Sequence, residues 1–171
     1  MEPKKYQKNT LEILENFLNE LQKVGLKYAF MGITDKPYKG EAFNDIPFIC
    51  IKIPTGGGKT LVGCYAIEKI MRNFLQYKME RGILLWFVPS EAIKSQTLRK
   101  FKDKRDGHRK ILDGFFDNNV KVFSNEEALS IRKSDISDNL CIIISSLEAF
   151  RKDKKIQNKY KVYKENGALL D

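Results

Sequence analysis

Apolar residues along this chain recur at two spacings, one typical of helices and one typical of strands. Leucines recur at helical spacing from Leu11 to Leu21, which predicts an N-terminal helix that begins near Pro3 and ends near Gly25. Elsewhere the apolar residues form short uninterrupted runs, which are typical of buried strands.

The short runs predict an α/β fold. We expect buried strands at 48–53, 82–88 and 140–144, and a shorter strand at 120–123. Helices are expected after 58, at 91–102 with Ser90 as cap, around 111–116, after Asn125 as cap, and from 147 through Phe150. The stretch 32–47 is rich in turn residues, and the chain beyond Arg151 is charged and aperiodic. Strands that alternate with helices predict a mainly parallel sheet flanked by helices, covered on both faces.

The most informative segment lies between the first strand and the following helix. It reads Lys52-Ile53-Pro54-Thr55-Gly56-Gly57-Gly58-Lys59-Thr60. Successive glycines let backbone amides approach an anion closely, and the helix that follows presents free N–H groups and its positive dipole end. Lys59 is placed for the β- and γ-phosphates and the Thr60 hydroxyl for Mg²⁺, so this segment predicts a phosphate loop.

A glycine-rich turn is the plainer interpretation of the same residues. Ile53 favours it, because the general phosphate-loop pattern has glycine at that position. The surroundings favour phosphate binding, because a predicted strand precedes the loop and apolar residues at helical spacing follow it, namely Ile67, Ile70, Met71 and Phe74.

Composition and charge limit the partners, the cellular compartment and the metal sites that we expect. The 171 residues suffice for one domain, and a net charge of +9 favours polyanionic partners, although a solvated lysine-rich surface has the same composition. Cys50, Cys64 and Cys141 lie in apolar segments without metal-ligand spacing, so we expect core residues in a reducing compartment. His108 is the only histidine and lies in a polar run, where we expect it to be solvated. With no signal peptide or membrane span in the sequence, we expect a cytoplasmic protein that does not bind membranes.

Two further segments follow predicted strands, where ligands gather in α/β sheets. Pro89-Ser90 forms a turn before a helix whose free amides suit a backbone phosphate, and Ser145-Ser146 places two hydroxyls after the 140–144 strand. Each segment is also an ordinary turn with a helix cap.

The order of these segments resembles the first motor domain of superfamily 2 helicases and translocases. The succession is Tyr6-Gln7, then IPTGGGKT, LWFVPSEA and IIISSLEAF. The chain looks closest to the motor subunit of type III restriction enzymes, and a Pro-Thr pair before the glycines is usual in that superfamily. The resemblance implies a RecA-like P-loop NTPase domain over residues 1–171, with the adenine-reading motif on the helix at 1–26 and the phosphate-loop core at 48–150.

The resemblance also implies roles for individual residues. Gln7 would read the adenine edge with Tyr6 near the base, and residues 54–60 would hold ATP and Mg²⁺, with Lys59 and Thr60 the catalytic pair. Backbone contacts to double-stranded DNA would come from two pairs, Pro89-Ser90 and Ser145-Ser146.

Superfamily members carry an Asp-Glu motif on a later strand, and none is found here. Asp135 and Asp138 fall in an expected polar loop, and Asp171 ends the sequence. We therefore expect an incomplete motor domain with little ATP turnover of its own, an unpaired sheet edge, and partners that include a second lobe in cis or trans and a modification or recognition subunit.

Two other interpretations stay open. A small P-loop phosphotransferase would share the phosphate loop, but the sequence gives no clear acceptor site or set of converging arginines. A non-enzymatic nucleotide-binding remnant, or one piece of a split protein, shares almost all of the same sequence features.

Overall fold

The structure is a computed structural model that describes residues 1–40, 46–75 and 81–150. The chain divides into two compact units, Met1–Lys78 and Met79–Asp171. In the described residues no helix has both the length and the apolar character needed to cross a membrane.

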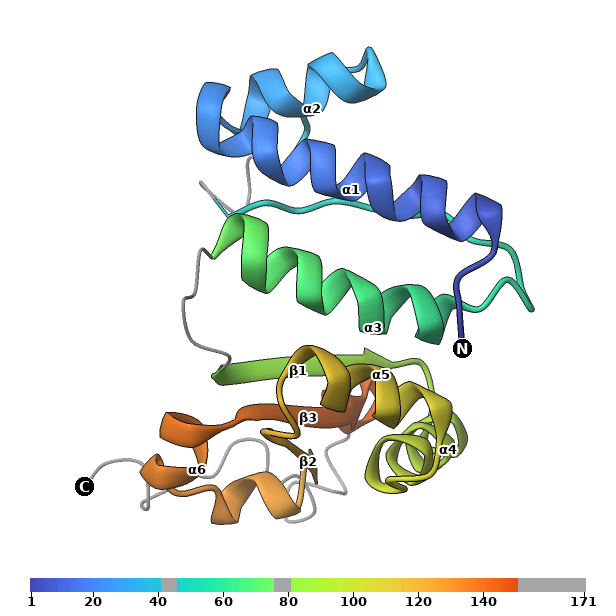
Figure 1. The fold of residues 1–171 in the computed structure, drawn as a ribbon, viewed down its shortest axis with the longest axis vertical. Coiled ribbons are helices and arrows are strands. Elements are labelled where there is room, and N and C mark those ends of the chain that lie inside the picture. The colour runs from blue at the N-terminus through green and yellow to red at the C-terminus, as the bar shows by residue number, and fades with distance from the viewer. Residues whose placement is uncertain (41–45, 76–80, 151–171) are drawn as a thin grey trace. The chain divides into compact units, whose positions relative to one another are not determined.

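The first unit is built from three helices, α1 (Lys5–Val24), α2 (Leu26–Thr34) and α3 (Lys59–Lys69), with a π-helical turn, η2 (Ile70–Phe74), continuing α3. Within this unit α2 and α3 both lie against α1 (Figure 1). The predicted N-terminal helix is confirmed, and it ends at Gly25 because a φ of 80° there is easy for glycine. Its buried side is packed into a core by residues of α1 and α2: Leu14, Phe17, Leu18 and Ala29.

Two expectations for this unit are wrong. The sequence analysis missed α2, which runs through Gly32 into the stretch expected to form turns. Its apolar residues pack on α1, and this tertiary burial outweighs the weak helix propensity of glycine. The apolar residues at helical spacing after the loop were expected to form one buried side of a helix. Ile67 is buried, but Ile70 is 37% exposed because the chain passes into η2 there.

The predicted strand at 48–53 does not form. The segment carries no strand assignment, and it is not buried, since Phe48 is 57% and Ile51 40% exposed. Ile49 instead packs against the helical core, and residues 49–51 line an apolar hollow of 190 Å³ with α1 and α2. A strand needs a neighbouring strand for its backbone N–H and C=O groups, and this segment is not part of the described sheet; its Phe48 N–H donates instead to the Tyr38 hydroxyl at 2.8 Å.

The second unit contains a parallel sheet in the order β1-β3-β2 (Figure 1). Its strands are β1 (Gly82–Val88), β2 (Val120–Ser124) and β3 (Leu140–Ser146). The central strand β3 is buried almost throughout, as expected for a continuous apolar run in a parallel sheet. The structure therefore confirms the α/β fold class, with a small parallel sheet flanked by helices.

Strand β1 lies at the edge of this sheet and is not fully covered. Its residues alternate in exposure, and Ile83, Leu85 and Phe87 are 49%, 58% and 45% exposed. The prediction of a strand is confirmed, but the expectation that both faces of the sheet are covered is wrong here. An all-apolar strand is typical of a central position, so β1 has the sequence of an inner strand in an edge position.

The helices of the second unit are α4 (Glu91–Lys102), α5 (Gly107–Phe115) and α6 (Lys133–Asp138), with 3₁₀ turns η3 (Glu127–Ser130) and η4 (Leu147–Phe150). Helix α4 packs on β3 and β2, and α6 contacts β1 and β3. Asp135 and Asp138 therefore lie in a helix, where a loop was expected. Residues 151–171, including the expected charged tail, lie outside the described residues.

The structure corrects three smaller expectations, two of them through local hydrogen bonds. Asn125 does not cap η3, because Ser124 and Glu127 bond reciprocally, each accepting from the other's backbone N–H. The His108 ring is not solvated, since its Nδ1 lies 2.8 Å from Asp106 Oδ1 and its side chain is 14% exposed. Cys64 and Cys141 are buried as expected, whereas Cys50 is exposed.

Candidate functional site

The phosphate loop in the first unit requires each of its three glycines. Gly56 and Gly58 have φ of 77° and 74°, in the left-handed region that glycine adopts readily. Gly57 has no room for a side chain, because a Cβ there would lie 2.6 Å from Ile53 and 2.9 Å from the Pro54 carbonyl oxygen. The loop closes on itself through the Gly57 N–H, which donates to the Pro54 carbonyl at 3.0 Å.

Helix α3 begins directly after the loop and presents free amides. Within the part of the chain that the structure describes, the first bond across this helix start runs from the Val62 N–H to the Gly58 carbonyl, at 3.0 Å. The backbone N–H groups of Gly58, Lys59 and Thr60 have no hydrogen-bond partner among those residues. Unpaired amides at a helix start, with the positive end of the helix dipole, attract an anion of the size of a phosphate group.

Lys59 and Thr60 stand at the first two positions of α3. The Lys59 ammonium folds back over the loop and donates to the Pro54 carbonyl at 3.0 Å, and its side chain is exposed. A phosphate would be a stronger partner for this cation than a neutral carbonyl, so the ammonium is available to a ligand. Thr60 follows Lys59 and is half-buried; a threonine hydroxyl is a ligand type that Mg²⁺ accepts.

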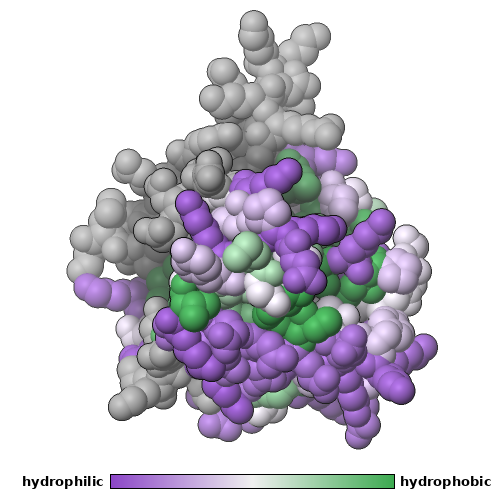
Figure 2. Space-filling view, turned by 90° about the horizontal axis from the view of Figure 1, so that it is seen from above, coloured by the Kyte–Doolittle hydropathy of each residue, from purple (hydrophilic) through white to green (hydrophobic). Residues whose placement is uncertain are grey.

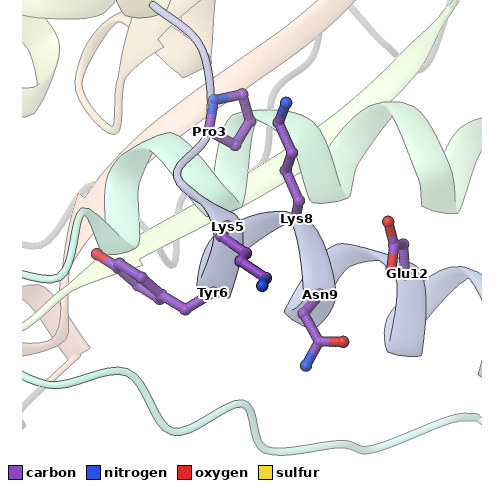
Figure 3. Close-up of a pocket in the computed structure, with 6 residues that line it drawn as sticks. All are labelled: Pro3, Lys5, Tyr6, Lys8, Asn9 and Glu12. Carbon is purple, nitrogen blue, oxygen red and sulfur yellow. The ribbon is translucent and has the colours of Figure 1, made fainter.

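Tyr6 and Gln7 reach this loop from the first turn of α1. The Tyr6 hydroxyl and the Gln7 Nε2 both donate to the Gly57 carbonyl oxygen, at 2.9 and 2.8 Å. Gln7 is buried, with 3% of its surface exposed, and its Oε1 accepts from the Lys4 N–H. Figure 3 shows the Tyr6 ring extending from this turn beside a hollow that is also lined by Pro3, Lys5, Lys8, Asn9 and Glu12. The predicted adenine motif and the predicted phosphate loop are thus joined by hydrogen bonds.

The other predicted site residues lie in the second unit, at the carboxyl ends of two paired strands. Val88 pairs with Ser146, so Pro89-Ser90 and the end of β3 are neighbours. Pro89 is exposed, but Ser145 and Ser146 are 4% and 0% exposed and form the last two positions of the strand, which the sequence analysis placed before them.

Glu91 occupies the space beside these serines. The Ser146 hydroxyl donates a short hydrogen bond to Glu91 Oε1, which lowers the pKa of this carboxyl. Ser90 is the N-cap of α4 as predicted, but its side chain makes no capping bond. A negative carboxylate therefore lies at the helix start where a backbone phosphate was expected.

Lys94 links the strand ends of this unit. Its side chain is 9% exposed, and its ammonium lies 3.0 Å from Glu91 Oε2, 2.8 Å from Asn125 Oδ1 and 3.3 Å from Glu126 Oε1. Asn125 and Glu126 follow β2. Glu91 lies shortly after β1 and accepts a hydrogen bond from Ser146 at the end of β3. The buried Lys94 ammonium therefore links the ends of all three strands. Sequence reasoning missed Glu91 and Lys94, and the only signal was their spacing on one side of α4.

The described residues contain no group of three or more His, Cys, Asp or Glu side chains that could hold a metal ion. Any Mg²⁺ at the phosphate loop would therefore be held by Thr60, phosphate oxygens and water, which suits a cation that keeps several of its waters.

Comparison with known proteins places the chain in a family. A family model described as "Type III restriction enzyme, res subunit" matches residues 1–170. No curated protein and no solved structure matches the chain.

Proposed function

We propose that this chain, which belongs to the type III restriction enzyme res subunit family, binds ATP through residues 54–60 as part of an ATP-dependent DNA translocase. The domain of this family is a helicase-type ATP-binding motor. The observation that carries this proposal is the loop itself, with its glycine-only backbone and free amides at the start of α3. The restriction-type role follows from the family and is part of the proposal.

The loop suits a triphosphate with Mg²⁺. The amides of residues 58–60 would hold phosphate oxygens, Lys59 would exchange the Pro54 carbonyl for the β- and γ-phosphates, and Thr60 would bind the cation. The bound cation would neutralise charge that develops on the phosphates during transfer. We assign Lys59 and Thr60 the catalytic roles in the complete motor.

The second unit is proposed as the DNA-contacting part. The net charge of +9, which is that of the whole chain, favours binding to a polyanion but does not single out this unit. Pro89 is exposed and Ser90 half-buried directly after β1, so they are the better placed of the predicted contacts, whereas the Ser146 hydroxyl would first have to leave Glu91. In Figure 2, which looks from above the view of Figure 1, the coloured residues are largely hydrophilic, with apolar patches between them.

The remainder of the motor is the proposed partner, in cis or in trans. Its strands would pair with the edge of β1 and cover Ile83 and Leu85, which are about half exposed. Because the family's Asp-Glu motif and second lobe are also expected there, we propose that this chain alone turns over little ATP. A modification or recognition subunit would belong to the same assembly, and we propose that it works in the cytoplasm.

The test is binding of a labelled non-hydrolysable ATP analogue to the purified chain. We expect Lys59→Ala to weaken binding at least tenfold, because it removes a charge-assisted contact to the phosphates. Lys52→Ala is the matched control, since it removes an exposed lysine just before the loop and should leave affinity unchanged. Equal affinity of Lys59→Ala and the unmodified chain would overturn the proposal. Robust ATP hydrolysis by the chain alone would overturn the proposed dependence on the rest of the motor.

A further inference from the structure

Two side chains of α1 meet the phosphate loop at a single atom, the carbonyl oxygen of Gly57. The Tyr6 hydroxyl donates to it at 2.9 Å and Gln7 Nε2 at 2.8 Å. Gln7 is also fixed at its other end, because Oε1 accepts from the Lys4 N–H at 2.8 Å. The Gln7 amide is thus bonded on both sides within the protein and buried.

Holding this carbonyl fixes the orientation of the next amide. In a planar trans peptide the carbonyl oxygen and the following N–H point in opposite directions. The Gly57 carbonyl faces α1, so the Gly58 N–H faces away from α1, and it has no partner among the described residues. Packing supports the same geometry, because a Cβ on Gly58 would come 2.5 Å from Gln7 Nε2.

We propose that Tyr6 and Gln7 are positioning residues for the phosphate loop, which orient the Gly58 amide toward a bound phosphate. This inference rests on the proposed binding of a nucleotide by the loop. Tyr6 and Gln7 would then raise the affinity of the loop for phosphate groups whichever nucleotide base is attached.

The test compares three ligands on one variant. Tyr6→Phe removes only the hydroxyl of a residue that is 45% exposed, so the chain keeps its core. Affinities for non-hydrolysable ATP and GTP analogues and for inorganic tripolyphosphate should all fall by the same factor, about threefold to tenfold, which is the effect of one neutral hydrogen bond. Tyr28→Phe on α2 is the matched control, because Tyr28 is 66% exposed, and it should change none of the three affinities.

The outcomes separate the possible roles. A loss for the ATP analogue alone would show adenine reading and overturn the inference. A lower melting temperature with all three affinities unchanged would show a merely structural bond and would also overturn it. If the unmodified chain binds none of the three ligands, the proposed function fails and this inference fails with it, whereas binding that is insensitive to Tyr6→Phe refutes the inference alone.

Discussion

The segment 48–53 of the first unit and strand β3 of the second are both short, apolar and rich in β-branched residues, but only β3 is part of a sheet. Strand β3 lies between β1 and β2, which the same unit supplies, and it is buried almost throughout. The segment 48–53 is not part of the described sheet, and its Phe48 and Ile51 side chains are 57% and 40% exposed. Both segments are apolar and rich in isoleucine, so we attribute the difference mainly to the neighbouring strands available to each.

Strand β1 is intermediate between these two segments. It pairs with β3 along one edge only, and alternate side chains remain about half exposed. A run of apolar residues therefore predicts that a segment can form a strand, while the number of its neighbours decides whether it is unpaired, at an edge or central.

The largest difference between the two regions should appear in stability. Ile142 in β3 is 0% exposed, and we expect Ile142→Ala to lower the free energy of unfolding of the second unit by about 2–5 kcal/mol. Ile51→Ala should lower the stability of the first unit by less than about 1 kcal/mol, because Ile51 is already 40% exposed. Trp86 is the only tryptophan and lies in β1, so its fluorescence during urea unfolding reports on the second unit. The helical circular dichroism signal also includes the helices of the first unit. Similar losses for both substitutions would contradict the comparison.

The exposed edge of β1 should make the chain associate with itself. Leu85 is 58% exposed on this strand, and Leu85→Lys should weaken self-association about tenfold, because an edge lysine opposes strand pairing and removes apolar area. Sedimentation over a range of concentrations measures the effect. Tyr28→Lys, on the 66% exposed Tyr28 of the first unit, adds the same charge and should have little effect. A chain that stays monomeric at every concentration would show that the β1 edge does not mediate self-association.

A smaller effect is expected on DNA binding by the second unit. The hydrogen bond from Ser146 lowers the pKa of Glu91, so the carboxylate is charged at neutral pH and repels a phosphate near the start of α4. Glu91→Gln should raise affinity for a labelled DNA duplex about threefold. Glu20→Gln changes the net charge equally on an exposed part of α1, and an equal rise in that variant would mean that only total charge matters.

The smallest effect is a pH dependence in the first unit. Hydrogen bonds from Lys69 and then Asn73 lower the pKa of Glu15 below its usual 4.5, so ionised Glu15 adds stability above that pH, and the stability is lost as pH falls through the lower native value. The pair is partly exposed, so we expect less than about 1 kcal/mol. Urea midpoints of the unmodified chain and Glu15→Gln should therefore converge as pH is lowered from neutral to below 4.5. A constant difference across this range would assign the effect to packing.

The sequence correctly predicted those features that depend on residues close to one another along the chain. Gly25 ends α1, the three glycines form the loop before α3, and the bounds of β1 and α4 agree with the apolar pattern. In each case the signal and the structure that it specifies lie within a few residues of each other.

The rest depended on tertiary neighbours that the pattern does not contain. Helix α2 is stabilised by packing on α1, and the buried position of Ser146 follows from its pairing with Val88. The convergence of Tyr6 and Gln7 on Gly57 joins residues that are 51 and 50 positions apart, and no spacing rule predicts it. One local signal was overlooked, the Ser124-Asn125-Glu126-Glu127 capping box.

The central claim is that the phosphate loop of the first unit binds ATP, and amide chemical shifts measured by nuclear magnetic resonance test it most directly. On addition of Mg²⁺ and a non-hydrolysable ATP analogue, we predict that the amides of residues 56–60 shift most and that those at the centre of β3 stay in place. Saturable shifts confined to the second unit, or no saturable shift anywhere, would contradict the claim.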